Sequence, residues 1–165
     1  QGQPVEMTLP EDYKLQFKTP SGKIELWTDR DEEPMPRYTT PHGDEAEFWL
    51  INGPDPRILD SSFNERVFIS DGPLMKARMH PADMDKKKLG DGAKVVLYND
   101  RGEVRMTLAA DEAVLPGTVV SDGVWWQKYS SDDEHGINAL TADRPTDRAW
   151  GSTFYDVKVN VRVDE

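Results

Sequence analysis

The sequence contains no cysteine, only three histidines and no long apolar run, and each of these absences removes a class of function. Without thiols the chain cannot supply a disulfide, a thiolate zinc site or the ligands of an iron–sulfur cluster. His42, His80 and His135 stand far apart and lack the spacing of metal ligands. No stretch approaches the roughly 18 consecutive apolar residues of a membrane-spanning helix, and residues 1–10 lack a signal-peptide pattern. We therefore expect no metal site and no membrane insertion.

Acidic side chains outnumber basic ones by 31 to 20, so the formal net charge is −11. A general nucleic-acid binder needs a basic face to neutralise phosphates, and this balance argues against that function. A chain of 165 residues usually forms one domain, and a hydrophobic fraction of 36 % is enough for a core beneath a polar surface. The composition therefore favours a globular domain that does not bind nucleic acid.

Short apolar or alternating segments, separated by turn signals, predict a mainly β fold. Residues 48–51 form a continuous apolar run, which is typical of a strand buried on both faces. In residues 157–163, valines alternate with polar side chains, as in a strand with one buried face. Residues 99–102 supply a hairpin signal between two further apolar segments. The predicted strands are 23–28, 48–51, 95–98, 104–108, 118–121 and 157–163.

One helix is predicted over residues 81–90. Proline and an acidic side chain stand in its first turn, lysines stand in its last turn, and Gly90 follows the last apolar residue, in agreement with helix capping and the helix dipole. Residues 29–47 carry several prolines and many acids, which predicts an extended connector. The expected architecture is therefore a barrel or sandwich of short strands with long loops.

The loop over residues 52–64, which follows the apolar run, is the first candidate binding site. Glycine permits a ligand to approach the backbone closely, arginine offers a two-pronged fork to phosphate, and serine hydroxyls complete the contacts with an anion. The alternative is an ordinary polar turn with an ion pair between Arg57 and Asp60. The loop presents Gly53, Arg57, Asp60, Ser61, Ser62 and Asn64, and the first five of these are its candidate site residues.

Two more segments carry groups suited to a planar ligand. Trp125 and Trp126 follow Gly123 at the end of a predicted strand, where an indole either stacks on a ring or packs in the core. The side-chain amide of Asn138 either hydrogen-bonds the edge of a heterocycle or closes its own turn. No nucleophile elbow surrounds Ser61, and we expect no catalytic residue in this chain.

Several short motifs occur in the order in which a known family has them. The motifs are residues 17–26, 50–64, 80–95, 99–103, 115–119, 138–141 and 151–155. Taken together they resemble the C-terminal molybdopterin-dinucleotide-binding domain of the dimethyl-sulfoxide-reductase family of molybdenum or tungsten oxidoreductases. The resemblance covers most of the chain, from residue 17 to the end. His80 stands where the family pattern usually has asparagine.

The resemblance implies a six-stranded double-psi β-barrel with one or two short helices and long loops. It implies that residues 1–47 are an extended connector from the preceding part of a parent chain, and that residues 48–165 form the barrel. It also implies a prokaryotic parent oxidoreductase, whose remaining domains or subunits are the partners of this one and supply the metal ligand. The isolated chain should then be inactive.

The cofactor implied by the resemblance is bis-molybdopterin guanine dinucleotide with Mo or W. This domain would hold and cap the dinucleotides without carrying the redox chemistry itself. By resemblance, the candidate loop residues meet phosphate, ribose or pterin edges, Trp125 lies against the pterin region, Asn138 hydrogen-bonds a pterin, and Tyr155 sits at the cofactor. Asp83 is a candidate for a structural or guanine-side contact.

Two other functions fit the same residues. A non-enzymatic β-barrel interaction module would use an exposed apolar patch and would not need Arg57 or Asn138. A carbohydrate-binding β-sandwich would use Trp125 and Trp126 as a stacking platform. Sheet topology separates the sandwich from the other two, because a sandwich has two open sheets and a double-psi barrel is closed.

Overall fold

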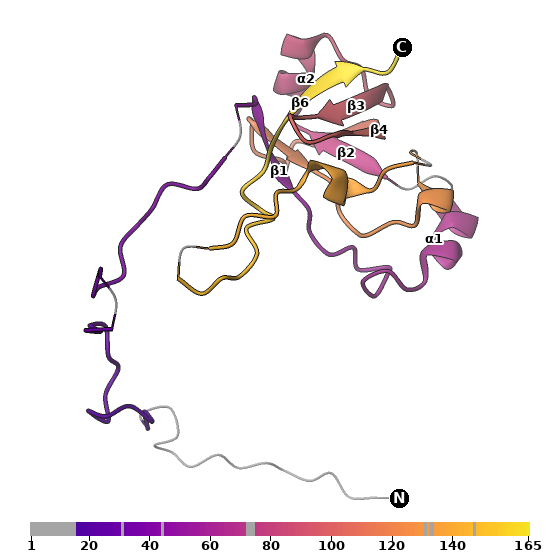
Figure 1. Ribbon diagram of the computed structural model, residues 1–165. Coiled ribbons are helices and arrows are strands. Elements are labelled where there is room, and N and C mark those ends of the chain that lie inside the picture. Colours follow the sequence, from indigo (N-terminus) through magenta and orange to yellow (C-terminus); the bar gives the residue numbers. More distant parts are fainter. Residues whose placement is uncertain are drawn as a thin grey trace, which may run out of the picture. The chain divides into compact units, whose positions relative to one another are not determined.

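The computed structural model describes residues 16–30, 32–43, 45–71, 75–130, 132, 134–146 and 148–165. The chain divides into two compact units, Gln1–Thr40 and Pro41–Glu165. The strands and helices found among the described residues belong to the second unit (Figure 1). The first strand of that unit begins at Phe48, where the barrel was expected to start.

The first unit contains a turn and no strand among its described residues. The Gly22 N–H donates to the Thr19 carbonyl oxygen at 3.0 Å and closes this turn. The predicted strand over residues 23–28 is wrong, and Ile24 and Leu26 are 67 % and 63 % exposed instead of packing against a sheet. Alternation supplies an apolar face, but a strand also needs a neighbour to satisfy its backbone hydrogen bonds.

Six strands of the second unit close into a barrel. The pairs β1–β5 and β2–β4 are parallel, and the other four pairs are antiparallel. This closed, mixed barrel confirms the predicted fold class and excludes the two open sheets of the sandwich alternative. In barrel order the strands are β1 (Phe48–Ile51), β5 (Thr118–Val120), β2 (Lys76–Met79), β4 (Glu103–Ala110), β3 (Lys94–Tyr98) and β6 (Lys158–Val163).

Alternating side chains fill the barrel. In β4, Val104, Met106 and Leu108 are buried while their neighbours are partly exposed, as the pleat of a strand requires. The prediction that the apolar run 48–51 is buried on both faces is wrong. Trp49 and Ile51 are 36 % and 46 % exposed, because β1 presents only its inner face to the core.

Two α-helices accompany the barrel, α1 (Asn64–Asp71) and α2 (Pro81–Lys87). The sequence does not predict α1, because Val67 is its one buried apolar side chain and no apolar stripe marks it. Two short 3₁₀ helices, η2 (Gln127–Tyr129) and η3 (Ile137–Leu140), lie in the long loops. Among the described residues, no helix has the length and apolar character needed to cross a membrane.

The predicted helix near residue 81 is confirmed as α2, but it ends earlier than expected. The Nδ1 atom of His80 accepts a hydrogen bond from the Ala82 N–H at 3.1 Å, so this histidine caps the helix as an asparagine oxygen would. Lys88 adopts a left-handed conformation with φ of 57° and closes the last turn. The sequence predicted that Gly90 would end the helix, but Lys88 caps it two residues earlier.

Asp83 ties α2 to the turn that precedes β5. Its side chain is 4 % exposed, its Oδ2 accepts the Gly117 N–H at 2.6 Å, and its Oδ1 accepts the Lys86 ammonium at 2.9 Å. Burial opposes ionisation of this carboxyl, but the hydrogen bonds from Gly117 and Lys86 outweigh it and lower the pKa of Asp83. The ionised carboxylate therefore stabilises the folded barrel.

We expect Asp83→Asn to destabilise the chain by about 1–3 kcal/mol at pH 7, because the Gly117 N–H loses its charged acceptor. Because the pKa of Asp83 is lower in the folded chain than in the unfolded chain, its carboxylate stabilises the fold at pH values above the unfolded pKa, near 3.8. This stabilisation is lost as the pH falls through the pKa of the folded state. The difference between variant and wild type should therefore shrink below about pH 4. Urea unfolding followed by circular dichroism at both pH values tests this. A pH-independent difference would contradict it.

Candidate functional site

Two adjoining pockets form where β1 and β5 end. The two strands run parallel with Ile51 opposite Val120, so the loops that follow them leave the barrel at the same edge. The first, which we call the Trp125 pocket, has a volume of about 630 Å³ and is lined by Met75 and residues 123–128 and 136–138. The second, the Gly53 pocket, has a volume of about 310 Å³ and is lined by residues 52–55, 58, 60, 123–124 and 154–155.

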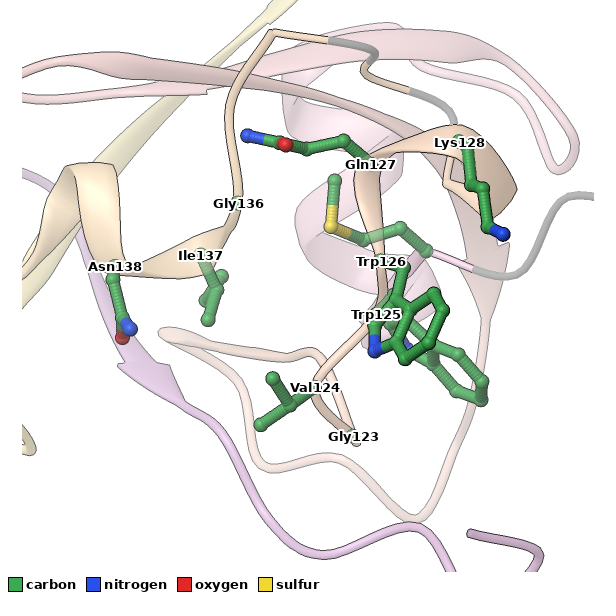
Figure 2. A pocket seen from close by; sticks show the side chains of 10 residues that line it. Gly123, Val124, Trp125, Trp126, Gln127, Lys128, Gly136, Ile137 and Asn138 are labelled. Carbon is green, nitrogen blue, oxygen red and sulfur yellow. The ribbon is translucent and has the colours of Figure 1, made fainter. Parts of the chain in front are cut away.

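Five of the nine predicted site residues line these two pockets. Trp125 and Asn138 line the Trp125 pocket, where they lie on opposite sides (Figure 2). Gly53, Asp60 and Tyr155 line the Gly53 pocket. Residues 123 and 124 belong to both pockets, so the two hollows share one wall. Segments far apart in the sequence are thus brought together, while the contacts of these residues with a cofactor stay predictions.

Arg57 is not among the lining residues of either pocket. Its Nε and Nη2 donate to the two carboxylate oxygens of Asp55 at 2.9 and 2.6 Å, and its Nη1 pairs with Asp71. The guanidinium carbon also lies 5.9 Å from the ring centroid of Trp125. The side-chain hydrogen bonds from Arg57 lower the pKa of Asp55 against the opposing effect of burial. The ion pair between Arg57 and Asp60, the alternative considered from the sequence, is therefore not formed. Arg57 instead pairs with Asp71 and so joins the loop to α1.

Besides Arg57, three more predicted residues line neither pocket, namely Ser61, Ser62 and Asp83. Ser61 and Ser62 are exposed in a tight turn, which the Ser62 N–H closes by donating to the Leu59 carbonyl at 2.8 Å. Asp60 stands inside this turn with φ of 48°, a left-handed conformation that aspartate tolerates. Asp83 makes the structural contact with Gly117 already described, away from both sets of lining residues.

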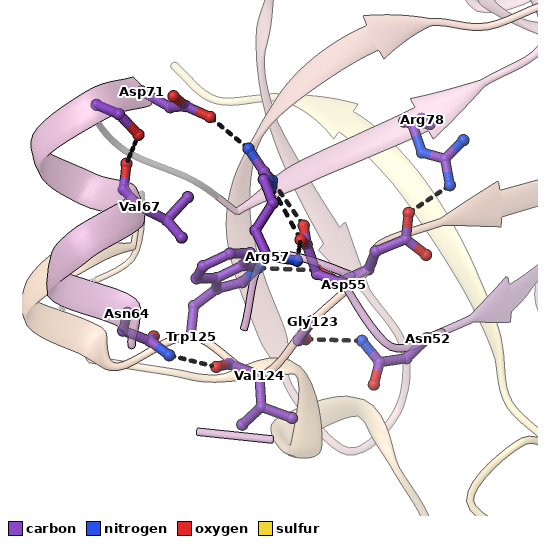
Figure 3. Close-up of polar contacts among 12 residues, drawn as sticks. Asn52, Asp55, Arg57, Asn64, Val67, Asp71, Arg78, Gly123, Val124 and Trp125 are labelled. Carbon is purple, nitrogen blue, oxygen red and sulfur yellow. Dashed lines mark hydrogen bonds and ion pairs between the residues drawn. The ribbon is translucent and has the colours of Figure 1, made fainter. Parts of the chain in front are cut away.

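A buried asparagine holds the wall that the pockets share (Figure 3). Asn64, the first residue of α1, is 0 % exposed. Its Oδ1 accepts the Trp126 N–H at 2.8 Å, and its Nδ2 donates to the carbonyls of Ser61 at 3.1 Å and Val124 at 3.2 Å. The amide thus satisfies backbone groups of both loops in a place that water does not reach.

A second asparagine and a glycine fix the same wall from the β1 side. The Nδ2 of Asn52 donates to the Gly123 carbonyl at 3.0 Å, and the Gly123 N–H donates to the Gly53 carbonyl at 2.8 Å. Gly123 has φ of 84°, and a Cβ atom there would lie 2.9 Å from the ring of Trp125, so no other residue fits without displacement. Neither Asn52 nor Asn64 is among the predicted site residues. Their position beside a strand end and a helix start is the signal that could have found them.

The two pockets differ in charge. Among the described residues that line the Trp125 pocket, Lys128 is the charged one, and its Nζ lies 4.9 Å from the ring centroid of Trp126 and 4.6 Å from that of Tyr129. Asp55 and Asp60 are the charged residues that line the Gly53 pocket. The side-chain amide of Asn138 has no hydrogen-bond partner in the described part of the chain. No cluster of three or more histidines and carboxylates suited to a metal occurs among the described residues.

We expect Asn64→Ala to lower the free energy of unfolding by about 2–3 kcal/mol, because it removes three hydrogen bonds made by a fully buried side chain. Asn64→Asp is the matched variant of nearly equal size. It keeps an acceptor for the Trp126 N–H but sets a carboxylate against two carbonyl oxygens, so it should destabilise at least as much at pH 7. Urea unfolding at pH 7 measures both. An aspartate variant as stable as the wild type would show that the amide donors contribute nothing.

Comparison with known proteins shows the family of this chain. Residues 48–158 match the family described as "Molydopterin dinucleotide binding domain". The probable oxidoreductase YoaE of Bacillus subtilis is 37 % identical over 156 residues, which cover 88 % of this chain and 22 % of that protein. The dimethyl sulfoxide reductase DmsA of Escherichia coli is 28 % identical over 167 residues, which cover 87 % of this chain and 20 % of that protein.

Among solved structures, acetylene hydratase from Pelobacter acetylenicus superposes with a TM-score of 0.76 over 91 % of this chain and 24 % of its own, at 18 % identity, and this shows the shared fold. The chain spans about a fifth of the length of the curated relatives it matches. The family match covers more than half of the chain, and a barrel with converging loops is what the motifs predict. The chain therefore belongs to the molybdopterin dinucleotide binding domain family, as found in relatives of the dimethyl-sulfoxide-reductase family.

Proposed function

We propose that this chain is the part of a larger oxidoreductase that binds bis-molybdopterin guanine dinucleotide, with Mo or W, and that it holds and caps the dinucleotides. The observation that carries the proposal is the convergence of five predicted residues on two adjoining pockets. Relatives named as dimethyl sulfoxide reductases and the family match support the same class of ligand. When bound, the cofactor supplies the redox chemistry, and the protein supplies binding and orientation.

The residues of the pockets fit the parts of such a ligand. A pterin or guanine ring is flat, which suits the indole side chains of Trp125 and Trp126. Its edge carries both donors and acceptors, which suits the side-chain amide of Asn138. The linking diphosphate is anionic, which suits the ammonium group of Lys128. In this proposal Trp125 is held in place by Arg57, whose guanidinium carbon lies 5.9 Å from the ring centroid.

The remaining domains or subunits of the parent protein are the proposed partners. Three of the residues that line the Gly53 pocket are exposed and apolar or aromatic, namely Val124, Phe154 and Tyr155, and Leu59 stands exposed in the same loop as Ile58 and Asp60. Such a rim suits burial by another protein surface once a ligand is enclosed. We propose that the partners cover this rim and supply the metal ligand, and that the chain alone is inactive.

The same exposed rim also favours the second candidate, a non-enzymatic β-barrel interaction module. Such a module would capture a protein through its apolar side chains and would need no ring-binding amide. The two functions therefore differ in what they require of Asn138, whose side chain has no described partner and no evident structural role.

We expect GDP, which carries the guanine and diphosphate of the cofactor, to bind the 165-residue chain weakly, in the millimolar range, because one domain meets only part of the ligand. In a titration of the ¹⁵N-labelled chain, resonances of the Trp125 indole and the Asn138 amide should shift. Asn138→Ala should weaken binding about two- to tenfold, since one or two neutral hydrogen bonds are lost.

Asn160→Ala is the matched control, because Asn160 lines a separate pocket that shares no residue with the other two. It should bind GDP as the wild type does. A chain that keeps its circular dichroism spectrum but shows no shift with millimolar GDP would overturn the proposal and favour the interaction module.

A further inference from the structure

Residues 24–27 have the side-chain pattern of a strand but no strand beside them. Apolar and polar side chains alternate from residue 23 to 26, so that Ile24 and Leu26 share one face, and both are exposed. Trp27 is exposed as well. Among the described residues, none forms a hydrogen bond with a backbone N–H or carbonyl group of residues 24–27. The segment therefore presents an apolar face and a row of unpaired peptide groups.

A closed turn stands on each side of this segment. Before it, the Thr19 Oγ1 donates to the Lys23 carbonyl at 2.6 Å. After it, the Thr28 N–H donates to the Pro34 carbonyl at 2.9 Å. The two turns leave four residues between them, which is within the usual length of a strand. Because the turns already fix both ends, pairing of the segment with a sheet would order few further residues.

The barrel of this chain cannot supply the missing neighbour. Its six strands close on themselves, so each of them already has two neighbours. A closed barrel has no free edge to which another strand can add. The same holds for the barrel of a second copy. The sheet that could accept residues 24–27 therefore lies outside the barrel.

A longer protein that contains this segment has room for such a sheet. One curated relative matches 96 % of the 165 residues of this chain, which leaves out about seven of them, so the match reaches through residues 24–27. The match covers 25 % of that relative's own length. Three quarters of the relative therefore lie outside the region that resembles this chain.

We propose, on the basis of the proposed place of this chain in a larger oxidoreductase, that residues 24–27 add as an edge strand to an open β-sheet in the remaining part of that protein. The sheet edge supplies the backbone partners that the segment lacks, and its apolar face covers Ile24 and Leu26. This added strand anchors the first unit of the chain to the parent protein. The addition needs no cofactor, so it can be tested apart from ligand binding.

Hydrogen–deuterium exchange followed by mass spectrometry tests the addition, in the parent protein and in the 165-residue chain. In the chain alone, the amides of residues 24–27 should exchange as fast as those of an unstructured peptide. In an edge strand, alternate N–H groups face the neighbour, so about half of these amides should exchange at least about a hundredfold more slowly in the parent protein. Equal, fast exchange in both proteins would overturn the proposal.

Two proline variants of the parent protein, Glu25→Pro and Leu26→Pro, test the strand itself. Proline removes one N–H, and neighbouring N–H groups of a strand point in opposite directions. One variant should therefore abolish the slow exchange of the segment, while the other keeps most of it. Thr39→Pro is the control, because Thr39 is exposed and lies outside the segment, and it should exchange as the wild type does. Slow exchange that survives both Glu25→Pro and Leu26→Pro would contradict strand pairing.

Concentration separates the proposed partner from a second copy. If the amides of residues 24–27 become protected in the 165-residue chain as its concentration rises, the segment pairs with itself and the proposed partner is wrong. Protection in the parent protein together with no binding of GDP by the folded chain would support the added strand and overturn the proposed ligand. Binding of GDP without protection would do the reverse.

Discussion

The side chain of Asn64 joins two loops that are some sixty residues apart, and the shape of both pockets depends on that connection. One buried amide uses its oxygen and its nitrogen to bind the backbone of Trp126, Val124 and Ser61. Without such a partner these three peptide groups would lose their hydrogen bonds to the fully buried amide, at a net cost of about 0.5–1.5 kcal/mol each. The wall between the pockets therefore has a defined position before any ligand arrives, which lowers the entropic cost of binding.

The wall that the two pockets share restricts which residues can stand at positions 123 and 125. Gly123 must adopt a positive φ, and its missing side chain leaves room for the indole of Trp125. That indole in turn donates from Nε1 to the Asp122 carbonyl at 2.8 Å and lies beside the guanidinium of Arg57. The indole of Trp125 is therefore mostly buried, with its N–H hydrogen-bonded. It forms a rigid part of the pocket wall and also packs in the core. The two interpretations of this tryptophan, stacking platform and core residue, are therefore compatible.

Short-range sequence patterns predicted most of the barrel strands but not the long-range contacts of the site. Strand alternation and the hairpin signal give most of the barrel, because a pleat alone decides which side chains face inward. The ion-pair partners of Arg57 and the role of Asn64 could not be predicted, since both depend on contacts made after the chain has folded. The exposure of Trp49 has the same origin: an apolar run shows that a strand forms, but only the barrel decides that its outer face stays uncovered.

In a chain with a net charge of −11, the basic group at the candidate site lies against aromatic rings. Among the described residues, Arg57 and Arg78 each bond two carboxylates, so neither presents a net positive charge to a ligand. In a chain with 31 acids and 20 bases, a cation placed near a carboxylate would be neutralised in the same way. The faces of Trp126 and Tyr129 position Lys128 without that loss. Salt screens acids that lie beyond roughly 8–10 Å, so an anion beside Lys128 would interact with this ammonium group more strongly than with the distant excess of acids.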